Sequence, residues 1–508
     1  MIRISKITVR MLCITLLLTG CTKDFLTLQP RDTLTSDNFF KTENDAQAAL
    51  IGIYNILERE TGFANVRDAA DIEWSISGDM EEEDGSANRV ELQTLNFPAS
   101  NTILRDVYET AYLGIGRANI VIGRVAQMSL PENVKNVIVA QAKFLRGIFY
   151  YRLVNYWGGV PLVLEELDAS SNLEIPRSAA EEVWTQVEKD LLEAAPHLPL
   201  EWDAKNKGRI TRAAAWGFLV KAALWRSKWD AAIQYSDSII KMPQHHLLPV
   251  FRDVFREKNE NNAEVIFSTQ FRPDRTSQGN NLVKRTAPRG APSQYVGDGS
   301  WSNFVPQQHW VNAYEKDGTG KIKDRRYWQT IIGPGEQHQV NGFVMPVPVP
   351  AGYSSTGYIM TKYWEFPPKD NLPNAGINPP GLRYAEVLLN YAEALNEKAR
   401  TAEALEQVNK IRERAGLDAL PLTLGKDATL DAIFYERRME FIWEPTGAFS
   451  DLNRRGRFID FIKKNRKDIA TLEIEKKPWL TANPILLPIP RAAWERNKKL
   501  EQNPHYTF

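Results

Sequence analysis

The sequence predicts a mainly α-helical fold of tetratricopeptide-like helix pairs that carries an irregular, loop-rich lobe. Through most of the chain after residue 37, apolar residues recur at steps of three and four, which is the period of amphipathic helices. An alanine stands four positions before an aromatic or aliphatic residue at Ala140, Ala231 and Ala404, a step typical of tetratricopeptide units about 34 residues long. Ordinary antiparallel helix packing would give similar spacing and is the alternative. Two segments, 61–100 and 245–380, break the helical period and predict the lobe.

The first 20 residues have the layout of an export signal. Three basic residues precede an apolar run over 11–18, which is shorter than the ~20 residues of a membrane span. The sequence Leu-Thr-Gly-Cys that ends at Cys21 resembles a bacterial lipobox, in which the chain is cut before the cysteine and its thiol is acylated. We therefore expect a lipoprotein signal peptide over 1–20, lipidation of Cys21 and a lipid-anchored tether over 21–36. A plain signal peptide with a chance cysteine is the alternative.

Composition excludes several classes of protein. The chain has 63 Lys plus Arg and 63 Asp plus Glu, and this neutral balance argues against a nucleic-acid-binding protein, which would show a basic excess. Of the two cysteines, Cys13 leaves with the leader and only Cys21 remains, so an intramolecular disulfide is excluded. No later segment has the run of about 18 apolar residues that a membrane-spanning helix needs.

The helices expected along the chain follow from apolar spacing. One begins after the N-cap candidates Asn44 and Asp45. From Val137 two neighbouring apolar stripes make a wide apolar face, so that helix should be central in the fold. Further helices are expected over about 178–195, 212–227, 229–241, 382–398, 402–415 and 428–443.

The segment 245–380 is rich in Pro, Gly and aromatic residues. A stretch of this length without regular structure is usually functional or disordered. Disordered segments are poor in aromatics, whereas this one contains many, including Trp328 and Trp364. We therefore predict an ordered, loop-rich lobe inserted into a helical frame.

Several segments together resemble the SusD/RagB family of outer-membrane nutrient-binding lipoproteins. They are "AQAKFLRGIFYYRLVNYWGGVPLV" (140–163), "LRYAEVLLNYAEALNE" (382–397), "ALEQVNKIRERAGL" (404–417), "NPILLPIPRAAWERNKKLEQNPHY" (483–506) and "CTKDFLTLQP" (21–30). The resemblance covers nearly the whole mature chain in the right order. It departs at "PTGAFSDLNRRG" (445–456), where family members usually have Gly-x-Arg before Asp-Leu. We expect the corner there to be built differently.

This resemblance implies the fold, the role and the partners. It implies a SusD-like domain over 37–508, in which a right-handed tetratricopeptide-like superhelix packs against the lobe formed by 61–100 and 245–380. It also implies a cell-surface protein, lipid-anchored to the outer membrane, that binds a nutrient, most often an oligosaccharide or polysaccharide. The implied partner is a SusC-like TonB-dependent transporter. No cofactor and no catalytic activity are implied.

Ligand-binding residues are expected on the loops of the lobe. Sugar rings offer apolar C–H faces flanked by hydroxyls, so a binding surface needs flat aromatic side chains and a few fixed polar groups. Loops on a rigid scaffold can present aromatic rings to solvent. Packing of the lobe itself is the alternative role for each ring. The candidates are Trp74, Asp79, Asn88, Tyr295, Trp301 and Trp310, with Arg67 as a further polar group.

The sequence offers little other chemistry. None of the six histidines has metal-ligand spacing, and no nucleophile elbow or phosphate-binding loop occurs. The acidic run 81–84 could hold a calcium ion or accept hydrogen bonds from sugar hydroxyls, or be a solvated loop. A periplasmic repeat scaffold that binds protein partners, and a surface glycoside hydrolase, are the alternative functions.

Overall fold

The computed structural model describes residues 39–58, 71–83, 85–168, 170–272, 279–287, 301, 303–336, 339–340, 343–344, 354–364, 376–466 and 473–508. The predicted signal peptide, Cys21 and the tether up to residue 36 lie outside these ranges, as do the candidate residues Arg67 and Tyr295.

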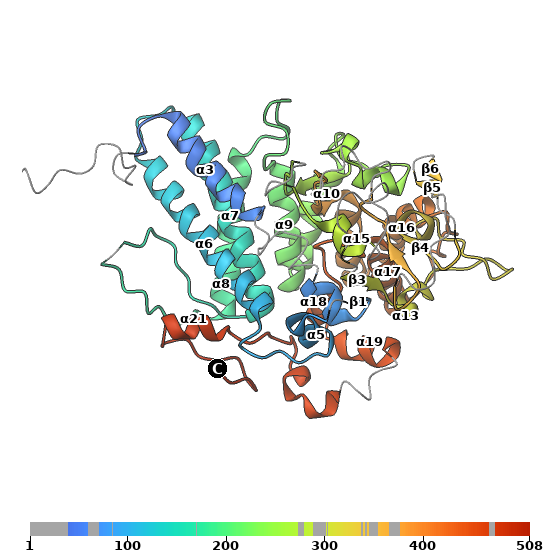
Figure 1. Cartoon of the computed structure of the whole chain (residues 1–508). Coiled ribbons are helices and arrows are strands. Elements are labelled where there is room, and N and C mark those ends of the chain that lie inside the picture. Colours follow the sequence, from blue (N-terminus) through green and yellow to red (C-terminus); the bar gives the residue numbers. More distant parts are fainter. Residues whose placement is uncertain are drawn as a thin grey trace, which may run out of the picture.

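Antiparallel helices form the first half of the molecule, from the left of Figure 1 to its middle. Each helix packs on the next in chain order, with α3 against both α6 and α7. The N-cap of α3 is Thr42, and not Asn44 or Asp45 as expected from the sequence, because the Thr42 hydroxyl accepts from the Asp45 amide in a capping box. The helices are α3 (Glu43–Leu57), α6 (Thr102–Ala126), α7 (Glu132–Trp157), α8 (Ala180–Ala194), α9 (Arg212–Trp225) and α10 (Trp229–Ile240).

The second half continues the same frame across the insertion. Helix α10 packs directly on α15 (Tyr384–Glu397), and α15 packs on α16 (Thr401–Arg414) and α17 (Lys426–Glu440). The mainly helical, tetratricopeptide-like fold predicted from the sequence is thus confirmed. The wide apolar face predicted from Val137 belongs to α7, which is buried along most of its length and contacts α3, α6, α8 and α9.

One long helix, α6, was not singled out from the sequence. It contains Gly114, Gly116 and Gly123, and glycine lowers helix propensity. The structure shows why position 114 is a glycine. A Cβ there would lie 2.3 Å from the Phe149 ring of α7. The glycine therefore allows the close crossing of α6 and α7.

The lobe consists of short elements that pair across long sequence distances. At its neck, β2 (Val265–Ser268) pairs antiparallel with β8 (Pro380–Arg383), which runs directly into α15. Strand β1 (Met80–Glu82) pairs with β3 (Phe304–Pro306) and joins the segment after α3 to the insertion. The remaining pairs are β4 (Ile331–Ile332) with β7 (Ile359–Met360) and β5 (Gln339–Val340) with β6 (Phe343–Val344).

Short helical turns fill the lobe and the C-terminal part. Those before α15 are η2 (Asp71–Ser75), α5 (Ala87–Gln93), η3 (Ala195–His197), η4 (Phe251–Phe255), η5 (Glu257–Asn259), α11 (Leu282–Thr286), α13 (Gln308–Val311) and α14 (Tyr327–Thr330). Those after α17 are α18 (Ala448–Arg454), α19 (Phe458–Asn465), η8 (Ile474–Lys476), η9 (Pro478–Thr481) and α21 (Arg491–Arg496).

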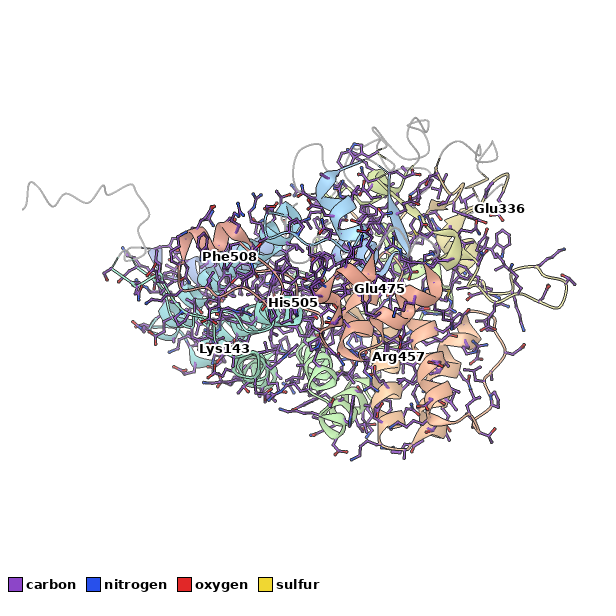
Figure 2. All side chains as sticks on the ribbon, turned by 90° about the horizontal axis from the view of Figure 1, so that it is seen from below. Lys143, Glu336, Arg457, Glu475, His505 and Phe508 are labelled. Atoms are coloured by element: carbon purple, nitrogen blue, oxygen red, sulfur yellow. The ribbon has the colours of Figure 1, made fainter. Side chains whose placement is uncertain are left out.

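The C-terminal segment runs back along the first half of the frame. Leu487 N donates to Tyr156 O at 2.8 Å, and Asn503 Nδ2 donates to Trp157 O at 3.1 Å. In the view from below, His505 and Phe508 lie on the half that carries Lys143 of α7, whereas Arg457 and Glu475 lie on the other half (Figure 2). The segment thus fixes the end of the central helix.

The corner at 445–456, where the sequence departs from the family pattern, closes on a buried carboxylate. Gly447 precedes α18, and a Cβ at this position would lie 1.6 Å from Glu73 Oε2. The same oxygen accepts from Ser450 N at 2.8 Å. Glycine therefore lets the corner approach Glu73, which caps the start of α18.

Buried charges fasten the lobe to the frame. Arg383, at the end of β8, is 1% exposed. Its guanidinium donates to Glu440 Oε1 of α17 at 2.7 Å and to Glu264 Oε1 at 2.8 Å, and it also binds Glu444. Lys362 of the lobe donates to Glu444 Oε1 at 2.5 Å. One guanidinium thus joins the neck of the lobe to the last helix of the frame.

We call the whole set the buried charge cluster. Its lobe members are Glu264, Asp324, Arg326, Lys362 and Arg383, and its frame members are Arg412, Arg414, Glu436, Glu440 and Glu444. The cluster holds as many carboxylates as cations. Burial lowers the pKa of Lys362 to about 8. Burial also acts to raise the pKa of Glu440, but Arg414, Arg383 and Arg326 outweigh it and hold that pKa well below its usual range.

We expect Glu440→Gln to destabilise the protein by about 3–5 kcal/mol at pH 7, because it removes one partner of buried charge pairs. Since the folded-state pKa of Glu440 lies below its unfolded value, its contribution is complete above that unfolded value of about 4.3. The contribution is lost as pH falls toward the folded-state pKa. Urea unfolding gives the free energy of unfolding of wild type and variant at each pH. The difference between the two free energies should be constant near neutrality and become smaller below about pH 4.

The matched control is Glu403→Gln, which removes an ion pair with Arg400 on the surface of α16. Its urea midpoint should remain near that of wild type, because exposed pairs contribute little. A Glu440→Gln variant as stable as the control at pH 7 would contradict the structural role of the cluster.

Candidate functional site

A polar cavity lies at one end of the β1–β3 pair. Because the two strands are antiparallel, the residues before β1 and those after β3 lie together, and Gln307 N donates to Asp79 O at 3.0 Å. The cavity has a volume of about 370 Å³. We call it the amide cavity, since Gln and Asn predominate in its lining of Gly78, Glu81, Gln93, Gln307, Gln308, His309, Asn312, Asn465 and Arg466.

The amide side chains of this cavity are held by their neighbours. Gln307 Nε2 donates to Glu81 Oε2, and Gln93 Oε1 accepts from Glu82 N at 3.3 Å. Gln308 Nε2, at the start of α13, donates to Oδ1 of the C-cap residue Asn312 at 2.9 Å. These bonds position hydrogen-bonding groups around the cavity before any ligand arrives, which lowers the entropy cost of binding.

A buried ion pair supports the wall of the amide cavity. Asp79 is fully buried, and its carboxylate accepts from Arg438 Nη2 of α17 at 2.6 Å. It also contacts His309 Nε2 of α13 at 3.0 Å. Burial acts to raise the pKa of Asp79, but Arg438 and His309 outweigh it, and the pKa lies below its usual value. The carboxylate is therefore ionised and fixes α13 to α17.

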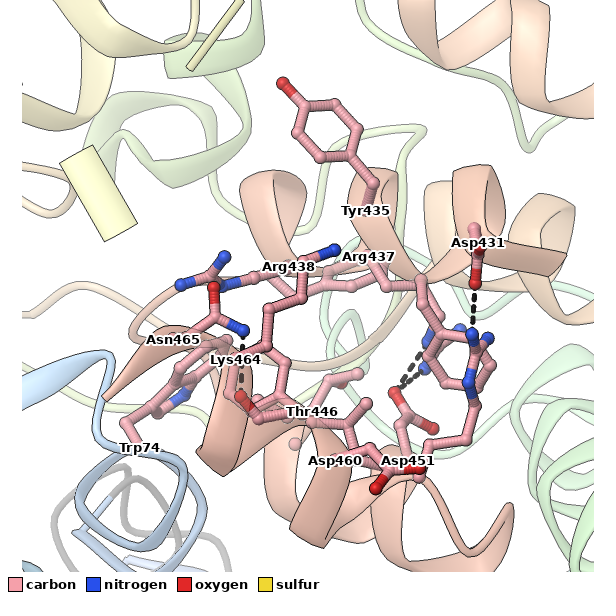
Figure 3. Close-up of a pocket in the computed structure, with 17 residues that line it drawn as sticks. Trp74, Asp431, Tyr435, Arg437, Arg438, Thr446, Asp451, Asp460, Lys464 and Asn465 are labelled. Atoms are coloured by element: carbon pink, nitrogen blue, oxygen red, sulfur yellow. Dashed lines mark hydrogen bonds and ion pairs between the residues drawn. The ribbon is translucent and has the colours of Figure 1, made fainter. Parts of the chain in front are cut away.

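A second cavity of about 390 Å³ adjoins the first, since Asn465 lines both. Figure 3 shows the second cavity. It lies between α17, α18 and α19 and is lined by the aromatic residues Trp74, Phe434, Tyr435, Phe441 and Phe461. Most of its charged groups are paired with each other. Arg437 bonds Asp451 at 2.5 Å, Arg457 bonds Asp431, and Arg438 lies 4.9 Å from the Phe461 ring centre.

Among the candidate residues from the sequence, Trp301 stands out from the surface. Its side chain is 41% exposed, and Lys284 Nζ lies 5.5 Å from its ring centre. Trp301 lies at the opposite end of β3 from the amide cavity. The six residue-to-residue steps from Trp301 to Gln307 span at most about 20 Å in extended conformation.

The expectation that Trp310 is an exposed loop residue is wrong. Trp310 is fully buried in α13, its ring centre lies 5.0 Å from that of Tyr314, and its indole donates to Arg438 O. Trp74 is also buried, and its indole donates to Glu444 O at 2.7 Å. Both indoles pack where α17 meets the lobe, so each has a structural partner that local sequence did not reveal.

The polar candidates have structural partners too. Asn88 Oδ1 accepts from Thr102 N at 3.1 Å at the start of α6, and Asn88 does not line either cavity. In the acidic run, Glu82 is buried and paired with Arg89, while Glu81 bonds Gln307. Asp84 is outside the described residues. Within those residues no group of three acidic, His or Cys side chains is placed to hold a metal ion.

Sequence reasoning missed the amide side chains that line the cavity. The "PQQHW" segment preceding and forming α13 supplies Gln307, Gln308 and His309. Two adjacent glutamines after a proline were a weak signal, because Gln is common on surfaces. Gln93 and Asn465 come from distant segments and share no local pattern.

Two protein-family models together match most of the chain. A model described as "SusD family" matches residues 263–506, and one described as "Starch-binding associating with outer membrane" matches residues 24–224. The chain is 28% identical to SusD-like protein P2 of Formosa agariphila, covering 99% of both chains. It is 26% identical to SusD-like protein P25 of the same organism, covering 92% of this chain and 94% of the relative.

Solved structures share the fold. A SusD superfamily protein from Bacteroides vulgatus superposes with a TM-score of 0.78 at 22% identity, covering 92% of this chain and all of the other. A laminarin-binding SusD-like protein gives 0.73 at 23% identity over 92% of this chain and 100% of its own. Surface glycan-binding protein A from Bacteroides fluxus gives 0.74 at 24% identity, with the same coverage of 92% and 100%.

Trp301, which precedes β3, and Trp310 of α13 should respond differently to truncation to alanine. We expect Trp310→Ala to cost about 3–5 kcal/mol, because it empties a buried indole site. Trp301→Ala is the matched comparison in the same segment, and it should leave the melting temperature near that of wild type. Thermal melts followed by circular dichroism measure both. A Trp310→Ala protein with the same melting temperature as wild type would contradict the buried placement of Trp310.

Proposed function

The chain belongs to the SusD family, and on that premise we propose that it binds a glycan at the cell surface and delivers it to a SusC-like TonB-dependent transporter. The amide cavity is the observation that carries the proposal. Sugar hydroxyls both donate and accept hydrogen bonds, and amide side chains offer both kinds of group on one rigid plane. The names of the relatives point the same way, since two of the similar structures are described as laminarin-binding and surface glycan-binding proteins.

The proposed glycan surface extends from the amide cavity along β3 to Trp301. The cavity would supply hydrogen bonds, and the exposed indole would stack on the apolar face of a sugar ring. A distance of at most about 20 Å between the two suits a chain of several sugars better than a single one. The strand between them is held on β1, so the two contacts keep a fixed spacing.

Binding without cleavage fits the carboxylates of the site. A glycosidase needs a pair of carboxyl groups, one of them an acid with a raised pKa. Asp79 has a lowered pKa and is bonded to Arg438, while Glu81 is bonded to Gln307. These two groups are therefore occupied in holding the cavity. This favours a binding protein over the hydrolase alternative.

The membrane location would come from the lipid on Cys21. None of the helices in the described ranges is long and apolar enough to cross a membrane. The family model that matches residues 24–224 carries an outer-membrane description. A lipid anchor on a tether would keep the helical domain at that membrane surface.

We expect the double variant Gln308→Ala with Asn312→Ala to weaken glycan binding about tenfold or more, because it removes two amides at a net cost of roughly 1 kcal/mol for each lost hydrogen bond. Both side chains are exposed, so the melting temperature should not change. Affinity electrophoresis against laminarin, soluble starch and other polysaccharides gives the measurement. Gln234→Ala on the exposed face of α10 is the control. If wild type and the double variant bind these polysaccharides equally, the glycan site does not lie in the amide cavity.

Cys21→Ala should release the protein from the outer-membrane fraction or leave the leader uncleaved, because the acylated thiol is gone. Cell fractionation with immunoblotting measures this. Cys13→Ala, inside the leader, is the control and should fractionate as wild type does. Retention of Cys21→Ala in the outer membrane at the wild-type level would disprove lipid anchoring.

A further inference from the structure

The orientation of three amides in the cavity is fixed by partners that can only donate or only accept. Gln307 Nε2 faces the Glu81 carboxylate, and Asn465 Nδ2 donates to Phe461 O at 2.9 Å. Gln93 Oε1 accepts from a backbone N–H. Rotating any of these amides by 180° would place two donors or two acceptors together.

These bonds determine which group each amide leaves for a ligand. Among the described residues, the carbonyl oxygens of Gln307 and Asn465 and the amide nitrogen of Gln93 have no partner. The bond between Gln308 and Asn312 leaves one further acceptor and one further donor, whichever way it runs. The cavity thus offers donors and acceptors in mixture.

The charged side chains in and near the cavity are hydrogen-bonded within the protein. Glu81 accepts from Gln307, and Arg466 Nη1 donates to Gln93 O at 2.7 Å. The nearby Asp79 is paired with Arg438 and His309. A carboxylate or sulfate can only accept hydrogen bonds, so it would face the open oxygens of Gln307 and Asn465 and the negative charge of Glu81.

We infer that the ligand of the amide cavity is a neutral glycan whose hydroxyl groups both donate and accept, and that the cavity selects against uronic-acid and sulfated polymers. This inference rests on the proposed function and specifies the chemical class of its ligand. A hydroxyl can pair with every open group of the cavity, whereas an anionic group can pair only with the donors.

The test compares matched neutral and anionic polymers on the intact mature protein. The neutral probes are laminarin, soluble starch and galactomannan, and the anionic probes are sulfated laminarin, carboxymethyl starch, alginate and polygalacturonate. We expect the tightest binding to a neutral polymer, an affinity loss of at least tenfold for its anionic derivative, and little change between 50 and 500 mM salt, because no ion pair is screened.

Two near-isosteric variants locate this selectivity in the cavity. Gln93→Glu and Asn312→Asp keep the internal bond of each side chain but replace an open donor with a charged acceptor. Each should weaken binding of the neutral polymer by roughly fivefold to tenfold. Gln234→Glu on α10 changes the net charge equally and should bind as wild type does.

Each other outcome overturns a defined part of the account. Tightest binding to an anionic polymer, weakened by salt, would refute neutral selectivity and leave glycan binding standing. If both cavity variants bind the neutral polymer as tightly as wild type does, the assignment of the glycan site to the amide cavity is wrong. Binding to none of these polymers would refute the proposed function and this inference with it.

Discussion

The position of the lobe depends on the salt bridges that Arg383 makes inside the protein. This side chain joins Glu264 near the neck of the lobe to Glu440 and Glu444 at the end of α17. Burying so many charges is expensive, and a buried ion pair often adds little net stability compared with apolar packing. Its geometric effect is larger, because a misplaced lobe would leave several charges buried without partners. The cluster therefore specifies one docking position for the lobe.

Helix α17 transmits that constraint to the candidate site. Glu436 and Glu440, one turn apart, belong to the buried charge cluster, whereas Arg438 lies between them in sequence and pairs with Asp79. Arg438 O also accepts from the Trp310 indole of α13. The same helix thus anchors the lobe with one set of side chains and the wall of the amide cavity with another. A binding surface made of short, irregular elements obtains its rigidity from a regular helix.

Most of the long elements were predicted from the sequence and most of the short ones were not; the exception is the long helix α6, which contains three glycines. Helices such as α7 and α15 contain several turns, so the apolar period was visible, whereas β1 and β3 have three residues each and show no period. Trp310 was expected to be exposed because it follows a Gly- and Pro-containing loop. Its burial depends on α17, where Arg438 O accepts from its indole across 128 positions of sequence, and local sequence could not place that helix beside it. The amide cavity was not predicted from the sequence for the same reason, because Gln93 and Asn465 come close to Gln307 only in the folded chain.

A crystal structure of the mature protein with the oligosaccharide fragment of its best-binding polymer would test the central claim most directly. We expect sugar density in the amide cavity, with hydroxyl groups within hydrogen-bonding distance of Gln308 and Asn312, and a ring stacked on Trp301 at the other end of β3. Sugar density on another face of the molecule, with the amide cavity holding only water, would contradict the account.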